Sequence, residues 1–338
     1  MWLLNTRTAE LRSFPYPTSV ISGYAILSHI WGEDCRGDTF QSVRATHDYC
    51  DYIAKEPLRA MAKALRAKRI ARSLSSPAAD ISALDQHCPP PVAPPNLPNP
   101  LTSTSARDYL TPLIRSFLVK AEEDGFDWAW AAICCIDFTS TAEVDKTVNL
   151  IYIYFALSSI CYAYLSDVSS DCRASDRDSE FTRSRWHTRS WTLQELLAPS
   201  NLLFFSKDWK RLGGKFSLAE AMEKNIPGSP PVSILHFQKD LSETSVAERL
   251  SWAAHRSATR VEDEAYSILG LFNIYMPTFY GEGRIAFYRL QEEIMRKWPD
   301  TSLFAWTDTI YPLSDIPEMI NLCKRHPEQE LLRHLFAP

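Results

Sequence analysis

The chain contains 338 residues, of which 45% are hydrophobic, so it is long enough for one large domain or two ordinary ones with a buried core. Its formal net charge of −5 provides no overall basic field, so we expect no nucleic acid as a partner. The first residues carry charge early and lack a long apolar run, which argues against a secretory signal peptide.

Two further features bear on localisation and cofactors. The eight cysteines include no CxxC pair, which favours reduced thiols and a cytoplasmic protein. The most apolar segment, 148–165, approaches the length of a membrane span, but polar residues interrupt it. We therefore predict a helix followed by a strand there, and no stable membrane insertion. No His, Cys and Asp cluster has convincing zinc spacing, so we expect no metal and no cofactor.

The first predicted strand covers residues 24–27 and ends in Ser28, His29 and a turn that contains Trp31 and Gly32. A strand that runs into small and polar residues marks the place where an open α/β sheet usually binds its ligand. His29 has three candidate roles there: a base, a hydrogen-bond donor to a ligand, or a core histidine whose hydrogen bonds are satisfied. Considered alone, His29 fits the last role best.

Residues from 44 to about 107 differ from the rest of the chain and are interpreted as an insertion. The segment 57–74 is a basic, Ala-rich helix candidate, and residues 88–100 contain seven prolines in thirteen positions. The basic helix could contact a partner or an anionic surface. A solvated charged face is the favoured interpretation.

After the insertion, helices and strands alternate with short connections. The apolar patterns predict a helix ending at Gly125, strands at 126–137, 159–168 and 201–209, and helices at 140–157 and 191–198. This alternation predicts an α/β fold with a mostly parallel sheet flanked by helices. The segments 246–258, 261–272 and 283–298 have helical periodicity, which predicts an added C-terminal helical subdomain.

The segment 184–209 places two tryptophans, several basic residues and one carboxylate before an apolar run. Trp191 and Glu195 are four residues apart on a predicted helix, so they share a face. Glu195 could be a catalytic carboxylate. It could instead complete an S/T-x-x-E capping box with Thr192, or pair with Arg185 or Arg189. From the local sequence alone, the structural roles are favoured.

The remaining polar candidates are weaker. Asp137 ends the strand 126–137, where it could face a ligand or cap the next helix. Residues 280–287, "YGEGRIAF", could hold an anion at a helix start, although a turn and cap is favoured. Four arginines could bind phosphate in a bidentate manner: Arg185, Arg189, Arg249 and Arg260. A Cys134 or Cys135 nucleophile is disfavoured, because both lie in an apolar strand.

Several segments in order resemble the fungal HET (heterokaryon incompatibility) domain family over residues 3–306. The matching segments are "YAILSHIWG", "CCID", "CYAYLSDV", "SRWHTRSWTLQELLAP", "FFSKDW", "SVAERLSWAAHRSATRVEDEAYSILGLF", "MPTFYGEG", "AFYRLQEEIM" and "SLFAW". The resemblance implies a HET domain over 1–306, with an α/β core at about 1–210 and a helical part at about 215–306. Residues 307–338 would be a tail or the start of a further region. The insertion at about 44–107 lies outside the pattern.

The resemblance implies a cytoplasmic role in non-self recognition, innate immunity and regulated cell death. The family is distantly similar to TIR domains, which have a flavodoxin-like fold. "ILSHIWGEDCRGDTF" is similar to the first TIR motif, and "SWTLQEL" is similar to the motif whose glutamate is catalytic in NAD⁺-cleaving members. This similarity implies a catalytic Glu195 and NAD⁺ or a related nucleotide as substrate. The implied substrate-binding residues are Ser28, His29, Trp31, Gly32, Asp137, Arg185, Arg189 and Trp191, with Arg249 and Arg260 as weaker candidates.

One position departs from the family pattern. The family usually has the sequence W-I-D-x-x-C-I-D, whereas this chain has "WAAICCID", so Ala132 replaces the first aspartate. If that carboxylate positions the substrate or orients His29, the loss weakens or abolishes catalysis. The alternatives to an NAD⁺ hydrolase are therefore a signalling module that acts by self-association, and a nucleotide sensor without turnover. An upstream receptor or sensor protein is the further partner that the resemblance implies.

Overall fold

The computed structural model describes residues 1–30, 37–58, 60, 61, 65, 91, 93, 94, 97, 103 and 105–304. Trp31, Gly32 and most of the predicted insertion, including most of its basic helix and of its proline-rich segment, lie outside this part of the chain. The predicted C-terminal tail, 307–338, also lies outside it. The statements below concern the described residues.

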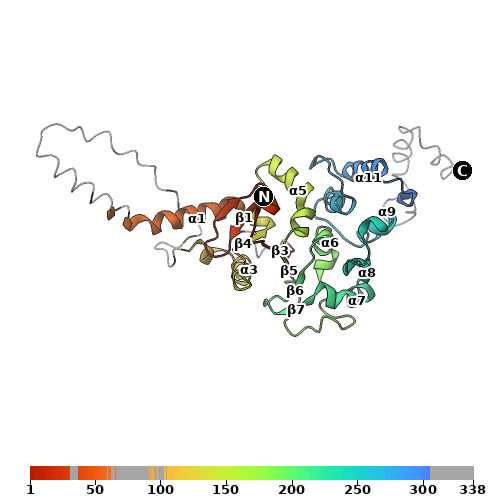
Figure 1. Ribbon diagram of the computed structural model, residues 1–338, viewed down its shortest axis with the longest axis horizontal. Helices are drawn as coiled ribbons and strands as arrows, with labels where there is room; N and C mark the ends of the chain where they lie inside the picture. Colours follow the sequence, from red (N-terminus) through yellow and green to blue (C-terminus); the bar gives the residue numbers. More distant parts are fainter. Residues whose placement is uncertain are drawn as a thin grey trace, which may run out of the picture. The chain divides into compact units, whose positions relative to one another are not determined.

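Seven strands form one sheet with the order β2-β1-β4-β3-β5-β6-β7 (Figure 1). The strands are β1 Trp2–Asn5, β2 Leu11–Ser13, β3 Ala25–His29, β4 Trp128–Ala131, β5 Ile160–Tyr164, β6 Leu202–Phe205 and β7 Arg211–Gly214. Strands β3 and β4 are parallel, whereas the pairs β1–β2, β1–β4 and β6–β7 are antiparallel. The sheet is mixed and flanked by helices, so the predicted α/β fold class is confirmed.

The helices follow the predicted order in the central part of the chain. The α-helices are α1 Phe40–Ala54, α3 Pro112–Glu123, α4 Ala132–Cys135, α5 Thr141–Ala156, α6 Thr192–Leu197, α7 Lys215–Asn225, α8 Val232–Leu235, α9 Val246–Ser251, α10 Asp263–Tyr266 and α11 Ile285–Lys297. The 3-10 helices are η1 Pro17–Ser19, η3 Ala106–Tyr109, η4 Arg185–Thr188, η5 Leu241–Glu243, η6 Leu269–Phe272 and η7 Thr301–Phe304. No described helix combines the length and apolar character needed to cross a membrane.

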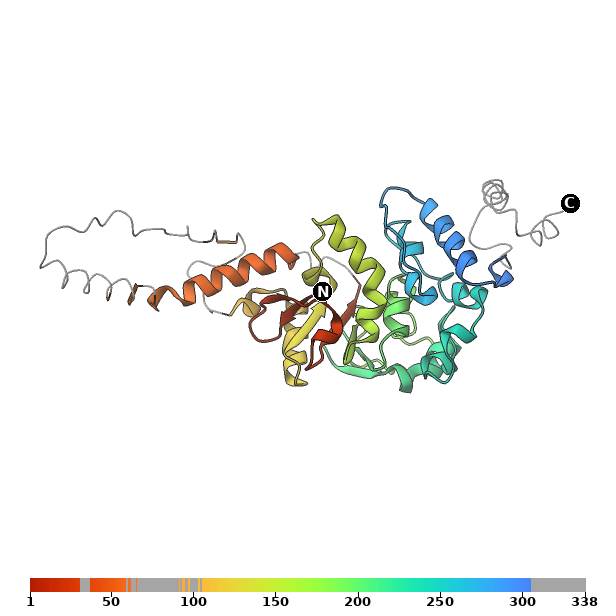
Figure 2. The same cartoon turned by 45° about the horizontal axis from the view of Figure 1, so that its top comes forward.

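The chain divides into two compact units, which are described separately. The first comprises residues 1–144 and 157–162, and the second comprises residues 145–156 and 163–338. In the first unit, α3 packs beside β4 (Figures 1 and 2). Helix α3 begins with Pro112 in its first turn, and Gly125 follows its end with φ +89°, a left-handed conformation that suits glycine. Its fully buried Phe117 contributes about 1.5–3 kcal/mol to folding.

The predicted strand at 126–137 is wrong in its second half. Strand β4 ends at Ala131, and Ala132–Cys135 form the short helix α4. The whole run is apolar, and periodicity alone cannot distinguish a buried strand from a buried helical turn in such a run. Ala132, which replaces the aspartate of the family pattern, is therefore the first residue of α4.

In the second unit, α5 is tied to the loop that precedes α11. The side chain of Asn149 accepts a hydrogen bond from the Met276 amide at 2.9 Å and donates to the Met276 carbonyl at 3.0 Å. The Asp145 carboxylate accepts from the Thr278 amide at 2.7 Å. Helix α11 buries one mostly apolar face, which consists of Ala286, Phe287, Leu290 and Ile294 together with the polar Gln291. The predicted helix at 283–298 is thereby confirmed as α11.

Candidate functional site

The end of β3 contains two of the predicted site residues in the first unit. Ser28 is 1% exposed and His29 is 7% exposed. The Nε2 atom of His29 has no hydrogen-bond partner among the described residues, and burial lowers the pKa of His29 to about 4. His29 is therefore a neutral imidazole at neutral pH. The described residues therefore do not show the predicted core histidine with all its hydrogen bonds satisfied, because among them one ring nitrogen lacks a partner.

Asp137 lies half-buried at the start of the connection to α5. Its Oδ1 atom accepts hydrogen bonds from the Thr139 amide at 2.9 Å and from the Gln41 side chain at 2.6 Å. These hydrogen bonds, first among them that from the Thr139 hydroxyl, lower the pKa of Asp137. The predicted capping of α5 by Asp137 is not observed, because Ser140 caps this helix through its hydroxyl, which accepts from the Glu143 amide at 3.3 Å. Asp137 thus stabilises the turn that precedes α5.

The adjacent cysteines do not form a nucleophilic site. Cys134 and Cys135 are 0% and 1% exposed, and burial raises the pKa of the Cys135 thiol to about 12. A thiol with so high a pKa remains protonated and unreactive at neutral pH. The structure thus gives a second reason to disfavour these residues, although they lie in α4 and not in a strand.

In the second unit, the segment before α6 is held against the chain that follows α9. The Ser190 amide donates to the Ser257 carbonyl at 3.0 Å, and the Ser257 amide donates to the Thr188 carbonyl at 2.7 Å. At the other end of α6, the buried Lys215 ammonium donates to the carbonyls of Leu196 at 3.3 Å and Pro199. A cation at the last carbonyls of a helix satisfies acceptors that have no partner within the helix. Helix α6 is thus fixed at both ends.

Glu195 lies in this short helix and is 8% exposed. The capping box proposed for it does not form, because Trp191 is the N-cap residue and the cap has no side-chain hydrogen bond. Thr192 is the first residue of α6, and its hydroxyl contacts the Arg189 carbonyl at 2.9 Å. Trp191 has helical backbone angles, so the predicted shared face of Trp191 and Glu195 is consistent with the structure.

Arg256 is the cation beside Glu195, and the sequence did not single it out. Its Nη1 atom donates to the Arg189 carbonyl at 3.0 Å and to the Thr192 hydroxyl at 2.9 Å. Burial lowers the pKa of Arg256 to about 9, and the charge of Glu195 opposes that shift. The Glu195 carboxylate is thus buried with a compensating positive charge. The only sequence signal was that Arg256 lies in the long motif at 245–272.

A second carboxyl group forms a hydrogen bond with Trp191. The half-buried Asp263 accepts hydrogen bonds from Trp191 and from the Tyr280 hydroxyl, the latter at 2.9 Å. Burial raises the pKa of Asp263 despite these hydrogen bonds. The guanidinium of Arg260 lies 4.7 Å from the centre of the Tyr280 ring. Two carboxyl groups therefore lie in the segments around Trp191: Glu195 is coupled to the charge of Arg256, and Asp263 has a pKa that burial raises although Arg260 opposes the shift.

The other predicted arginines have separate contacts. Arg185 forms an exposed ion pair with Asp167 at 3.5 Å, and Arg189 donates to the Thr259 hydroxyl at 2.7 Å. Arg249 is buried in another part of the second unit, where it donates to the Leu271 carbonyl at 3.0 Å. Of the four arginines, Arg189 and Arg260 belong to segments adjoining Trp191 and Asp263.

The "YGEG" segment forms a turn, as favoured from the sequence. The amides of Gly281 and Gly283 both donate to Oε1 of Glu262, at 2.8 and 3.0 Å. Both glycines have positive φ angles, +107° and +64°, which other residues adopt at a cost. The anion bound by this turn is a carboxylate of the same chain. No group of three potential metal ligands occurs among the described residues.

The fold and this site define an α/β protein in which a short helix presents a buried, charge-compensated glutamate next to a tryptophan. Over 186 residues, or 54% of its length, the chain is 39% identical to the vegetative incompatibility protein HET-E-1 of Podospora anserina. This match supports the predicted resemblance to the heterokaryon incompatibility (HET) family over these residues. The match covers 14% of the length of that relative.

Comparisons with protein families and with solved structures add little about function. Residues 285–335 match a family described as a domain of unknown function, DUF8212. This match begins with α11 and continues into residues outside the described part of the chain. No solved structure matches the chain.

Proposed function

We propose that the protein acts in fungal vegetative incompatibility as a cell-death effector, and that it hydrolyses the nicotinamide–ribose bond of NAD⁺. The relative's printed name and the family resemblance support the biological role. The placement of Glu195 supports the chemistry. This carboxylate is buried on α6, its charge is compensated by Arg256, and Trp191 lies one turn before it.

Cleavage of this bond develops positive charge at the ribose, as in glycoside hydrolysis. A fixed carboxylate stabilises that charge most strongly where water is excluded. Glu195 would perform this role, while the Trp191 ring would stack on a ring of the substrate. Nicotinamide leaves as a neutral group, so the reaction needs no strong general acid. Arg189 and Arg260 would bind the pyrophosphate, since guanidinium groups match phosphate oxygens.

The test is nicotinamide release from NAD⁺ by the purified chain, under conditions that favour self-association. Glu195→Gln keeps the shape of the side chain and removes its charge, so we expect a loss of about 100-fold or more. Glu220→Gln, on an exposed position of α7, is the matched control and should retain full activity. Undetectable release by the wild type, or equal release by both variants, would exclude this chemistry.

A second candidate function rests on Ala132. This residue stands where the family pattern has an aspartate, so the chain could instead signal by self-association or sense a nucleotide without turnover. Calorimetric titration with NAD⁺ and ADP-ribose distinguishes a sensor, which binds them without hydrolysis, from an assembly module, which binds neither. Restoring the carboxylate in Ala132→Asp should raise nicotinamide release if that group was needed for catalysis.

A further inference from the structure

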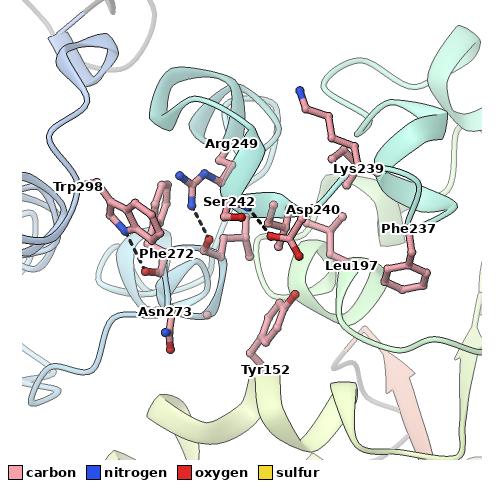
Figure 3. A pocket seen from close by; sticks show the side chains of 14 residues that line it. Tyr152, Leu197, Phe237, Lys239, Asp240, Ser242, Arg249, Phe272, Asn273 and Trp298 are labelled. Carbon is pink, nitrogen blue, oxygen red and sulfur yellow. Dashed lines mark hydrogen bonds between the residues drawn. The ribbon is translucent and has the colours of Figure 1, made fainter.

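The second unit contains a cavity of about 410 Å³ that is separate from the Glu195 site (Figure 3). Tyr152 of α5, Leu197 of α6 and Arg249 of α9 line it, together with Phe272 of η6 and Trp298 after α11. Neither Glu195 nor Trp191 belongs to its lining. Its volume lies within the range of pockets that hold small organic ligands.

Arg249 is the most unusual residue of this lining. Arg249 is 2% exposed. Its guanidinium lies 4.8 Å from the centre of the Phe272 ring and 5.1 Å from the centre of the Trp298 ring. One nitrogen donates to the Leu271 carbonyl at 3.0 Å, but Nε has no partner among the described residues. A buried donor without an acceptor costs about 1–3 kcal/mol. An anion bound by this guanidinium would compensate its buried positive charge.

Two of the carboxylates whose charges act on Arg249 already accept hydrogen bonds from backbone amides. Asp240 accepts from the Ser242 amide at 2.7 Å, and Asp300 accepts from the amides of Val246 and Ser302 at 2.7 and 2.9 Å. Burial lowers the pKa of Arg249, while the charges of Asp300, Asp240 and Glu248 favour its cationic form. The guanidinium of Arg249 is therefore buried, and its Nε atom has no acceptor among the described residues.

The rest of the lining favours a ligand with a flat ring. Trp298 is held in place by the hydrogen bond from its indole nitrogen to the Phe272 carbonyl at 3.2 Å. Tyr152 and Phe237 present further rings to the cavity, and Figure 3 shows the Tyr152 hydroxyl directed toward the Asp240 carboxylate. Aromatic walls bury large apolar area and orient a planar group by offset or edge-to-face packing.

We propose that this cavity binds a small organic anion that carries a planar aromatic ring, with the anionic oxygens accepting hydrogen bonds from Arg249. The anionic group is a carboxylate or a phosphate, since either matches a guanidinium. Leu197 places one wall of the cavity on the helix that carries Glu195. The Phe237 ring, at another wall, lies 4.1 Å from the Lys215 ammonium that caps this helix. The site does not depend on hydrolysis of NAD⁺.

The experiment is calorimetric titration of the full chain with indole-3-acetate and adenosine monophosphate, each beside its neutral counterpart, indole-3-acetamide or adenosine. At least one anion should bind tenfold or more tightly than its neutral counterpart. The better anion shows whether the site prefers a carboxylate or a phosphate. Arg249→Gln should abolish the preference for the anion. Ser242→Trp, at an exposed lining position, should fill the cavity and abolish binding altogether.

Three outcomes would overturn the proposal: no binding of either anion at millimolar concentration, equal affinity for the neutral counterparts, or unchanged binding by a folded Ser242→Trp variant. Circular dichroism establishes which variants are folded. If Arg249→Gln does not fold, Ser242→Trp and the neutral counterparts decide the matter. Glu195→Gln should bind the anions normally, which separates this site from the proposed hydrolase activity.

Discussion

At the end of β3, His29 is buried as a neutral group, whereas in α6 Glu195 is buried beside the cation Arg256. The first arrangement removes a charge by lowering a pKa, and the second retains a charge by supplying its opposite. The sequence had marked both residues as candidates at strand and helix ends. Of these two residues, Glu195 is the one that combines burial with a retained charge, which is the arrangement that electrostatic catalysis requires.

The largest effect on stability is expected from breaking the charge compensation at α6. Arg256→Met leaves the Glu195 carboxylate buried without its cation, so we expect a loss of about 3 kcal/mol in the free energy of unfolding. Urea denaturation monitored by circular dichroism measures this loss. The double variant Arg256→Met, Glu195→Gln should recover most of the stability. Equal stability of the single and double variants would show that the two charges do not depend on each other.

The neutral histidine predicts a pH dependence of intermediate size. The pKa of His29 is about 4 in the folded chain and 6.5 for an ordinary histidine, so the unfolded chain binds the proton more readily between these values. The stabilisation from a neutral His29 is present above pH 6.5 and is lost as pH falls toward 4. Between pH 7 and pH 5 we expect a loss of about 2 kcal/mol from this group.

The measurement compares urea denaturation at pH 7 and pH 5 for the wild type and for His29→Gln. The variant should lose less stability over this interval, by about 2 kcal/mol. His187 in the second unit, whose pKa burial lowers to about 3, contributes in the same direction and remains in both proteins. A variant with the same pH dependence as the wild type would contradict the neutral burial of His29.

A smaller effect is expected at the start of α6. Thr192→Val retains the shape of the side chain but removes the hydroxyl that contacts the Arg189 carbonyl and accepts from Arg256. We expect a loss of about 1 kcal/mol in stability. If the proposed hydrolase activity is present, its maximal rate should also fall, because Arg256 would lose one of the groups that position it. Thr192→Ser, which keeps the hydroxyl, is the control.

The smallest effect is expected from Arg185, which lies near α6 in sequence but on the surface. Its ion pair with Asp167 is exposed, with 71% of the Arg185 side chain accessible. Exposed pairs of this kind contribute about 0–1 kcal/mol, so Arg185→Ala should change stability by less than about 0.5 kcal/mol. If Arg185→Ala lowered the free energy of unfolding as much as Arg256→Met, solvent exposure would not explain why the two arginines differ in their contribution to stability.

Much of the fold followed from local pattern. The helix predicted at 140–157 is α5, and the strand predicted at 201–209 contains β6. The short strands β1, β2 and β7 were not predicted, because three or four residues carry too little pattern to identify a strand. The end of β4 at Ala131 was missed for a related reason, since α4 continues the same apolar run.

For the candidate site, the sequence by itself determined the helix of Glu195, the face that this residue shares with Trp191, and the family resemblance. These depend on residues close together in the chain, where spacing reports geometry directly. The tertiary structure decided which charge accompanies Glu195 and which acid lies beside Trp191. Arg256 and Asp263 reach α6 because the chain after α9 runs against the segment before it. The spacing of residues along the chain does not predict such a pairing, because burial and charge compensation arise only when distant segments pack together.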